Sequence, residues 1–108
     1  MFFSGLTLMF LKHVATGVWL TLPLLLSLAT LIALLGQVVG KMEGWPHFDS
    51  FYWSFVTATT VGYGDIRPIT RGSRTIAILI AILGLVFTGI IIAVAVHAAT
   101  LALDKIDR

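Results

Sequence analysis

The sequence has no cysteine and few charged residues. Of its 108 residues, 11% are Asp, Glu, Lys or Arg, whereas 58% are hydrophobic. The absence of cysteine excludes disulfide bonds and thiolate metal sites. So little charge is unusual for the surface of a soluble domain, and the chain is too short for two domains. The composition therefore indicates one small domain that lies in a membrane and contacts lipid.

A basic patch and a cluster of catalytic residue types are also missing. The formal net charge is only +2. The basic residues are scattered along the chain, at Lys12, Lys41, Arg67, Arg71, Arg74, Lys105 and Arg108. This scatter argues against nucleic acid as a partner. Because no acids, histidines or nucleophiles cluster in the sequence, we expect neither an enzyme nor a bound cofactor.

Two long stretches without Asp, Glu, Lys or Arg dominate what is present. The first lies between Lys12 and Lys41, and the second runs from Thr75 to Leu103. Each exceeds the roughly 20 residues that are needed to cross the bilayer core. They predict an outer helix over about residues 8–39, in which neighbouring helices tolerate Pro23, and an inner helix over about residues 72–103.

Between these spans, the apolar stretch SFYWSFVTATT is too short to cross a membrane. Asp49 or Ser50 would be a typical N-cap for a helix over about residues 49–59. At 1.5 Å per residue such a helix is on the order of 15 Å long, half of the bilayer core. Irregular backbone beyond it is tolerated at membrane depth only where it is buried in protein or lines an aqueous path. The sequence therefore predicts a re-entrant segment.

Two glycines follow this helix within TVGYGD, residues 60–65. Alternating right-handed and left-handed backbone turns successive carbonyls to one side. Gly62 and Gly64 adopt the left-handed form without the roughly 1–2 kcal/mol that other residues lose. A row of carbonyl dipoles replaces the hydration shell of a cation. Because one chain offers one oxygen per level, such a site needs a closed ring of several chains.

The stretch YWSFVTATTVGYGDIRPIT, flanked by two spans, resembles the pore domain of tetrameric potassium channels of the bacterial type, with two transmembrane helices per subunit. The resemblance covers nearly the whole chain, residues 1–108. It implies an all-α membrane protein in which the two spans flank a re-entrant pore helix and an extended selectivity filter. It also implies a homotetramer with four-fold symmetry that conducts K⁺ selectively and passively. The implied filter residues are Thr60, Val61, Gly62, Tyr63 and Gly64, with K⁺ bound at the first four.

The same resemblance assigns supporting roles around the filter. The implied supporting residues are Asp65, Trp53, Tyr52, Val56 and Thr59. Trp53 would hydrogen-bond Tyr63, which packs outward and holds the filter diameter, and Tyr52 would approach Asp65. The alternative interpretations are plain packing for Tyr52, a solvated loop acid for Asp65 and an interfacial aromatic for Tyr63.

Val56 marks a departure from the family pattern. Some bacterial members have a glutamate at this position, four residues before the first filter threonine. There it shares a proton with the aspartate that matches Asp65 and helps the filter collapse into a non-conducting state. Valine can neither accept nor donate a hydrogen bond, so we expect the filter of this chain to collapse less readily.

The inner span carries the implied gate. Gly84 matches the family's inner-helix hinge and Gly89 lies five residues further, although close helix packing is the alternative role for both. The residues implied to line the cavity and lower gate are Leu85, Thr88, Ile92, Ala93, Val96 and Thr100. A mostly hydrophobic constriction of this kind closes by dewetting.

The histidines give little indication of function, and the basic residues give little indication of membrane orientation. For His13 and His97, near the ends of the spans, we favour neutral interfacial or packing roles over proton sensing, and we expect His47 in a loop. The family implies cytoplasmic termini in a bacterial or archaeal plasma membrane. The positive-inside rule does not support that orientation. Three basic residues, Lys12, Lys105 and Arg108, lie toward the chain ends, whereas four lie between the spans.

Two other functions compete with a K⁺-selective pore. A non-selective cation channel would alter the Tyr-Gly part of the filter, which is intact here. A non-conducting two-span accessory subunit is compatible with the sequence. The five residues after Leu103 are too few for a regulatory domain, so the chain is expected to be either a small channel or the pore of a larger protein, with regulation supplied by another domain or subunit.

Overall fold

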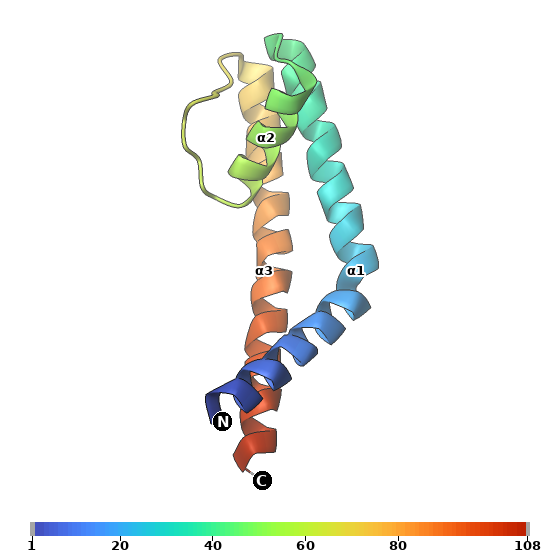
Figure 1. Ribbon diagram of the computed structural model, residues 1–108. Coiled ribbons are helices and arrows are strands. Elements are labelled where there is room, and N and C mark those ends of the chain that lie inside the picture. Colours follow the sequence, from blue (N-terminus) through green and yellow to red (C-terminus); the bar gives the residue numbers. More distant parts are fainter. Residues whose placement is uncertain (1, 108) are drawn as a thin grey trace. The chain divides into compact units, whose positions relative to one another are not determined.

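The chain forms three helices, α1 (Phe2–Glu43), α2 (His47–Ala58) and α3 (Arg71–Asp107) (Figure 1). The computed structural model describes residues 2–107, so Arg108, which was counted above among the basic residues, lies outside the described part. The expected fold, with two long helices flanking a short one, is confirmed. Both long helices extend beyond the ranges expected from the sequence.

The extra length of α1 at its C-terminal end has a local cause. Gly44 has a φ of +78°, and the Trp45 amide donates to the Gly40 carbonyl at 2.8 Å. This is the pattern of a glycine-terminated helix end, in which a left-handed residue stops the helix and its successor satisfies a free carbonyl. The helix therefore continues to Glu43, just before the first residue that ends it.

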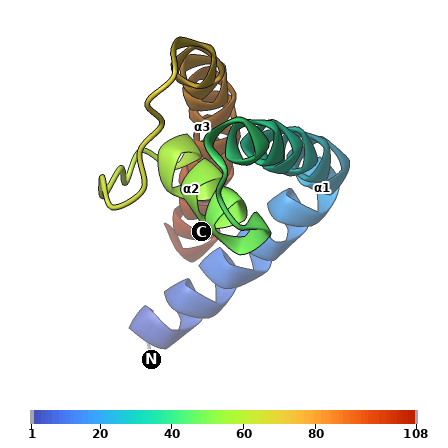
Figure 2. The ribbon, with the colours of Figure 1, turned by 90° about the horizontal axis from the view of Figure 1, so that it is seen from above.

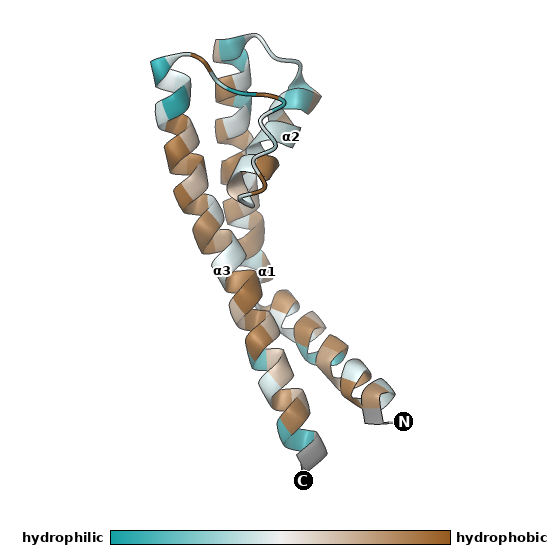
Figure 3. Cartoon of the chain, turned by 90° about the vertical axis from the view of Figure 1, so that its left-hand side faces the viewer, coloured by the Kyte–Doolittle hydropathy of each residue, from teal (hydrophilic) through white to brown (hydrophobic). Residues whose placement is uncertain are grey.

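Among the described residues, two helices are long and apolar enough to cross a membrane, over Phe3–Glu43 and Arg71–Lys105. Figure 3 shows hydrophobic residues along both, with the most hydrophilic ones gathered toward their ends. At 1.5 Å per residue, each exceeds the roughly 30 Å of the hydrocarbon core.

The start of α2 differs from the prediction that Asp49 or Ser50 is its N-cap. The helix starts at His47 after Pro46, which has φ −59° and ψ 157°, and no side chain caps it. Ser50 cannot serve as a cap because its side chain is buried and its hydroxyl donates to the Pro46 carbonyl at 3.0 Å. Proline is suited to this position because its fixed φ directs the chain into the first turn.

The chain divides into two compact units, and residues 26–88 form one of them. In this unit α2 lies beside parts of both α1 and α3, and the segment after α2 loops along the side away from α1 (Figures 1 and 2). Its core contains residues of all three helices, namely Ile32, Val39, Trp53, Ala58 and Ile80. The short helix is therefore held by the two longer ones.

Small residues allow α1 and α2 to approach closely in this unit. A Cβ atom added at Gly36 would lie 2.4 Å from the Ser54 Cβ, and one added at Gly40 would lie 2.6 Å from the Ser50 Cβ. Both serines are buried. The four-residue spacing on each helix places these two contacts on one seam. We call Gly36, Gly40, Ser50 and Ser54 the glycine–serine seam.

The other unit comprises residues 2–25 and 89–107, where the first part of α1 and the last part of α3 run in opposite directions (Figure 1). Leu25, Ala98 and Ala102 are buried here. A Cβ added at Gly17 would lie 2.6 Å from a methyl carbon of Val94, so the two helices cross closely at this pair.

Candidate functional site

The first residue of the TVGYGD segment also ends α2. Thr60 has a φ of +65°, its amide donates to the Thr57 carbonyl at 3.2 Å, and the Val61 amide donates to the Val56 carbonyl at 3.0 Å. This pair of hydrogen bonds is a Schellman motif with Thr60 in the left-handed position. A β-branched residue there is strained. This role of Thr60 was not predictable from the sequence, because glycine usually occupies such a position.

Gly62 and Gly64 adopt the left-handed backbone that the sequence predicted. Their φ values are +56° and +81°. The Gly62 amide donates a hydrogen bond to the Val56 carbonyl at 3.2 Å, so the first part of the segment lies against the end of α2. Val61 and Tyr63 are 51% and 71% exposed. A single chain thus presents this irregular backbone and its apolar side chains uncovered.

Asp65 is fixed on two sides. The Tyr52 hydroxyl donates to its Oδ2 at 3.0 Å, and the Ile66 amide donates to its Oδ1 at 3.1 Å. The first bond joins α2 to the end of the segment, which agrees with the expectation that Tyr52 approaches Asp65. The Asp65 carboxylate, by accepting this hydrogen bond, raises the pKa of Tyr52 above its ordinary value.

Trp53 packs inside its own chain, and its implied hydrogen bond to Tyr63 in an assembly stays a prediction. It is buried in the unit of residues 26–88, where its ring meets Trp45 edge to face at a centroid distance of 5.3 Å. Tyr63 is mostly exposed. Among the side chains of residues 3–105, no hydrogen bond joins Trp53 to Tyr63 within the single chain, so such a bond would have to form between subunits.

Val56 and Thr59 contribute mainly through the end of α2. The Val56 carbonyl accepts two amides of the following segment, while its side chain is half-buried. The Thr59 hydroxyl donates to the Phe55 carbonyl at 2.6 Å. Both residues thereby stabilise the point where helix changes to irregular backbone.

Glu43 has a structural role that the sequence did not predict. Its Oε1 accepts hydrogen bonds from the amides of Ile69 and Thr70, at 2.8 and 3.0 Å, and from the Thr70 hydroxyl at 3.1 Å. The Thr70 hydroxyl oxygen also lies 2.8 Å from that of Ser73, from which it can accept a hydrogen bond. One carboxylate thus joins the end of α1 to the start of α3. A separation of 26 residues gives no sequence pattern that would have revealed it.

The inner-helix glycines have unequal surroundings. A Cβ added at Gly84 would lie 2.0 Å from the Ala58 carbonyl oxygen, whereas one added at Gly89 would meet nothing within 4 Å. α3 continues through both. Of the residues implied to line the cavity, Leu85, Ile92 and Val96 are more than half exposed in the single chain.

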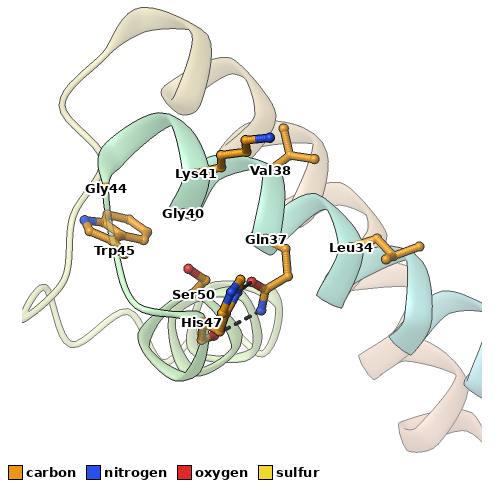
Figure 4. A pocket seen from close by; sticks show the side chains of 9 residues that line it. All are labelled: Leu34, Gln37, Val38, Gly40, Lys41, Gly44, Trp45, His47 and Ser50. Atoms are coloured by element: carbon orange, nitrogen blue, oxygen red, sulfur yellow. Dashed lines mark hydrogen bonds between the residues drawn. The ribbon is translucent and has the colours of Figure 1, made fainter.

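A pocket of about 690 Å³ lies beside the start of α2, on the α1 side (Figure 4). Gln37 donates from Nε2 to the His47 carbonyl at 3.0 Å, and His47 Nδ1 lies 2.9 Å from Gln37 Oε1. His47 is therefore the first residue of α2 and is tied to α1, instead of lying in a loop as expected. Lys41 and Trp45 also line this pocket.

Comparisons with known proteins agree with this geometry. A family model described as "Ion channel" matches residues 20–100. The TWiK family of potassium channels protein 7 of Caenorhabditis elegans is 49% identical over 70 residues, which are 62% of this chain and 13% of that protein. The human potassium voltage-gated channel subfamily A member 5 is 58% identical over 36 residues, 33% of this chain and 6% of that protein. The chain therefore spans only a small part of these relatives. No solved structure gives a significant match.

Proposed function

We propose, on the premise that this chain belongs to the ion channel family, that four copies of it form a pore that conducts K⁺ selectively and passively across a membrane. Membership of this family also confirms the expectation that the chain is not an enzyme. The proposed selectivity filter consists of residues 60–64. K⁺ would bind at Thr60, Val61, Gly62 and Tyr63, with their carbonyls in place of hydration water.

One observation carries the proposal. Directly after a helix of 12 residues, which is too short to cross a bilayer, the chain continues as irregular backbone with left-handed glycines at 62 and 64. Between two membrane spans, such backbone requires protein or water around it. A pore made by several chains supplies both, because neighbouring subunits cover the outer side and an aqueous path faces the inner side.

The exposure of the filter residues supports an assembly. Pore domains of this family assemble as tetramers. In the single chain Tyr63 is 71% exposed, and Leu85, Ile92 and Val96 on α3 are at least 57% exposed. A four-fold ring would cover Tyr63 with a neighbour and would turn these α3 residues toward the central cavity and lower gate, together with Thr88, Ala93 and Thr100.

Selectivity for K⁺ is proposed over non-selective cation conduction. Gly62, Tyr63 and Gly64 form the intact glycine-tyrosine-glycine part of the filter. The relatives reported above are potassium channels by name. The chain's own contacts also fix the filter's outer end, through the Tyr52–Asp65 hydrogen bond.

We further propose the bacterial type with two spans per subunit, with both termini cytoplasmic in a bacterial or archaeal plasma membrane. The family match, over residues 20–100, includes parts of both spans and the whole segment between them. Because the chain has no cysteine, single cysteines introduced at Gly5 and at Phe48 can be labelled separately with an impermeant reagent in right-side-out vesicles. Labelling of Phe48→Cys alone is the expected outcome, and labelling of Gly5→Cys alone would reverse the orientation.

The experiment that tests conduction uses the tag-free chain, purified in detergent and reconstituted into liposomes. Native mass spectrometry should give a tetramer, and planar bilayer recordings in opposing K⁺ and Na⁺ gradients should give a reversal potential near that for K⁺. Tyr63→Asp should move the potential toward zero. Phe48→Asp is the matched control, since Phe48 is 74% exposed but lies outside the filter. A monomer without flux would favour the accessory subunit.

A further inference from the structure

Two histidines from different helices line one cavity in the unit of residues 2–25 and 89–107. The cavity has a volume of about 340 Å³, and its walls include His13 and Gly17 of α1, and Val94 and His97 of α3. The remaining walls are largely apolar, apart from Thr21. The two histidines are 84 positions apart in the chain, at 13 and 97, and no sequence pattern links them.

The close crossing of Gly17 and Val94 sets the level of both imidazoles. His13 lies four residues before Gly17, and His97 lies three residues after Val94. At 1.5 Å per residue these offsets are about 6 and 4.5 Å along the two helix axes. Because these parts of α1 and α3 run in opposite directions (Figure 1), both offsets lead to the same side of the crossing, toward the chain ends.

We propose that His13 and His97 bind a divalent transition metal ion, such as Zn²⁺, in this cavity. Imidazole nitrogen is a preferred ligand of Zn²⁺ and of its first-row neighbours. Among the side chains that the structure describes, over residues 3–105, no hydrogen bond or ion pair engages either imidazole, so the ring nitrogens are available as ligands. Two imidazoles leave further coordination positions, which water fills.

The size and position of the cavity suit a partly hydrated ion. A water molecule occupies roughly 30 Å³ in the liquid, so about 340 Å³ holds the ion with several waters. His13 directly follows Lys12, where the charge-free stretch of α1 begins, and Asp104 directly follows the corresponding stretch of α3. The site therefore lies near the water-facing end of the spans, within reach of ions in solution.

Charges near the site act in both directions. Asp104 is seven residues after His97, two helical turns on the same face of α3, and its carboxylate attracts a cation toward the cavity. Lys12 and Lys105 oppose this attraction. In the described residues no group of three or more His, Asp or Glu side chains gathers, either at this cavity or elsewhere. We therefore expect a two-histidine site of moderate affinity, suited to a regulatory ion instead of a permanent structural one.

A bound ion would cross-link α1 to α3 next to the close contact of Gly17 with Val94. A part of α3 that is held to α1 in this way cannot move away from it, so the ion would restrict the inner helix. This consequence rests on the proposed channel function. The binding itself does not, and it can be measured in detergent without any ion flux.

The test measures metal binding to the tag-free tetramer or chain in detergent. Calorimetric titration with Zn²⁺ should show one site per chain, and His13→Ala and His97→Ala should each weaken it by at least about tenfold, because even the loss of an outer partner of a metal ligand commonly costs that much. His47→Ala is the matched control, since His47 lies in the other unit and is hydrogen-bonded to Gln37. It should bind Zn²⁺ as the parent does.

Cu²⁺ binding provides a second readout. If His13 and His97 had a purely structural role, substituting them would not change the number of imidazoles on the ion. Pulsed electron paramagnetic resonance should detect two imidazoles on Cu²⁺ in the parent chain and one in either single variant. Circular dichroism of each variant shows whether the helices remain folded. Detection of one imidazole in the parent, or equal affinity in the parent and both variants, would overturn the proposal. Zn²⁺ binding in a protein that carries no K⁺ flux would leave it standing while removing the channel function.

Discussion

At the scale of the residue, the two inner-helix glycines differ most clearly. Gly84 lies against the last turn of α2, where an added Cβ would come within 2.0 Å of the Ala58 carbonyl oxygen, whereas Gly89 has open space around it. The sequence suggested a hinge at Gly84 and close packing as the alternative. The contact with α2 shows that Gly84 permits close packing, and a hinge there stays a prediction.

The two alanine variants should therefore behave in opposite ways. Gly84→Ala should destabilise the fold by about 1–3 kcal/mol or more, because the neighbouring atom is rigid backbone. Gly89→Ala should be neutral or stabilising by up to about 1 kcal/mol, because alanine favours the helix. Chemical unfolding of both variants in mixed micelles, followed by circular dichroism, measures the difference. Equal stability of the two would refute this reading of the packing.

Tyr52 should control how long the filter stays open. Tyr52→Phe removes the hydrogen bond to Asp65 and should make macroscopic K⁺ currents decay several-fold faster after opening. The pKa of Tyr52 is raised by that bond. Its contribution is therefore fully present below the ordinary tyrosine value of about 10, and it is lost as the pH rises through the raised value.

Current decay in the parent should consequently be unchanged from pH 7 to about 10 and should accelerate only above that. The Tyr52→Phe variant should lack the alkaline acceleration. Recordings of both proteins from pH 7 to above 10 make the comparison. Identical decay in parent and variant would remove Tyr52 from the support of the filter.

At the scale of the element, the glycine–serine seam holds α2 against α1. Gly40→Ala should destabilise the fold by about 1–3 kcal/mol, because its Cβ would overlap the Ser50 side chain. Ser50→Gly removes the atoms that the new Cβ meets, so the double variant should recover part of that loss. A double-mutant cycle of unfolding free energies measures the coupling. Strict additivity would show that the two residues do not meet.

Much of each element could be predicted, but the joints between elements could not. Apolar length gave the two spans, and the paired glycines gave the left-handed backbone at 62 and 64. The start of α2 was missed because Pro46 directs the chain without a side-chain cap. The end of α2 was missed because Thr60, not glycine, takes the left-handed position.

Contacts over long sequence separation were also beyond prediction. Glu43 meets Ile69 and Thr70 only because α1 and α3 bring their ends together. The four-residue spacing of Gly36 and Gly40 is a sequence signal for close helix packing, and it could have predicted the glycine–serine seam. His13 and His97 line one cavity because α1 and α3 cross closely at Gly17. No local sequence pattern indicates this crossing.

At the scale of the whole molecule, the charge distribution predicts weak voltage dependence. Residues 13–40 and 75–103 contain no Asp, Glu, Lys or Arg. Moving one elementary charge through the full field changes the energy by about 2.3 kcal/mol per 100 mV, and these spans offer no such charge. Open probability of the reconstituted chain should change little over 200 mV, as about one gating charge or fewer per pore would give. A steep curve from the chain alone would contradict this.

The central claim is that residues 60–64 form a K⁺-selective filter, and the reversal potential of the reconstituted, tag-free chain tests it most directly. With K⁺ on one side of a planar bilayer and Na⁺ on the other, the account predicts a potential close to that for K⁺ in the parent and in Phe48→Asp. It predicts a shift toward zero in Tyr63→Asp. A parent potential near zero, or a Tyr63→Asp variant as selective as the parent, would contradict the account.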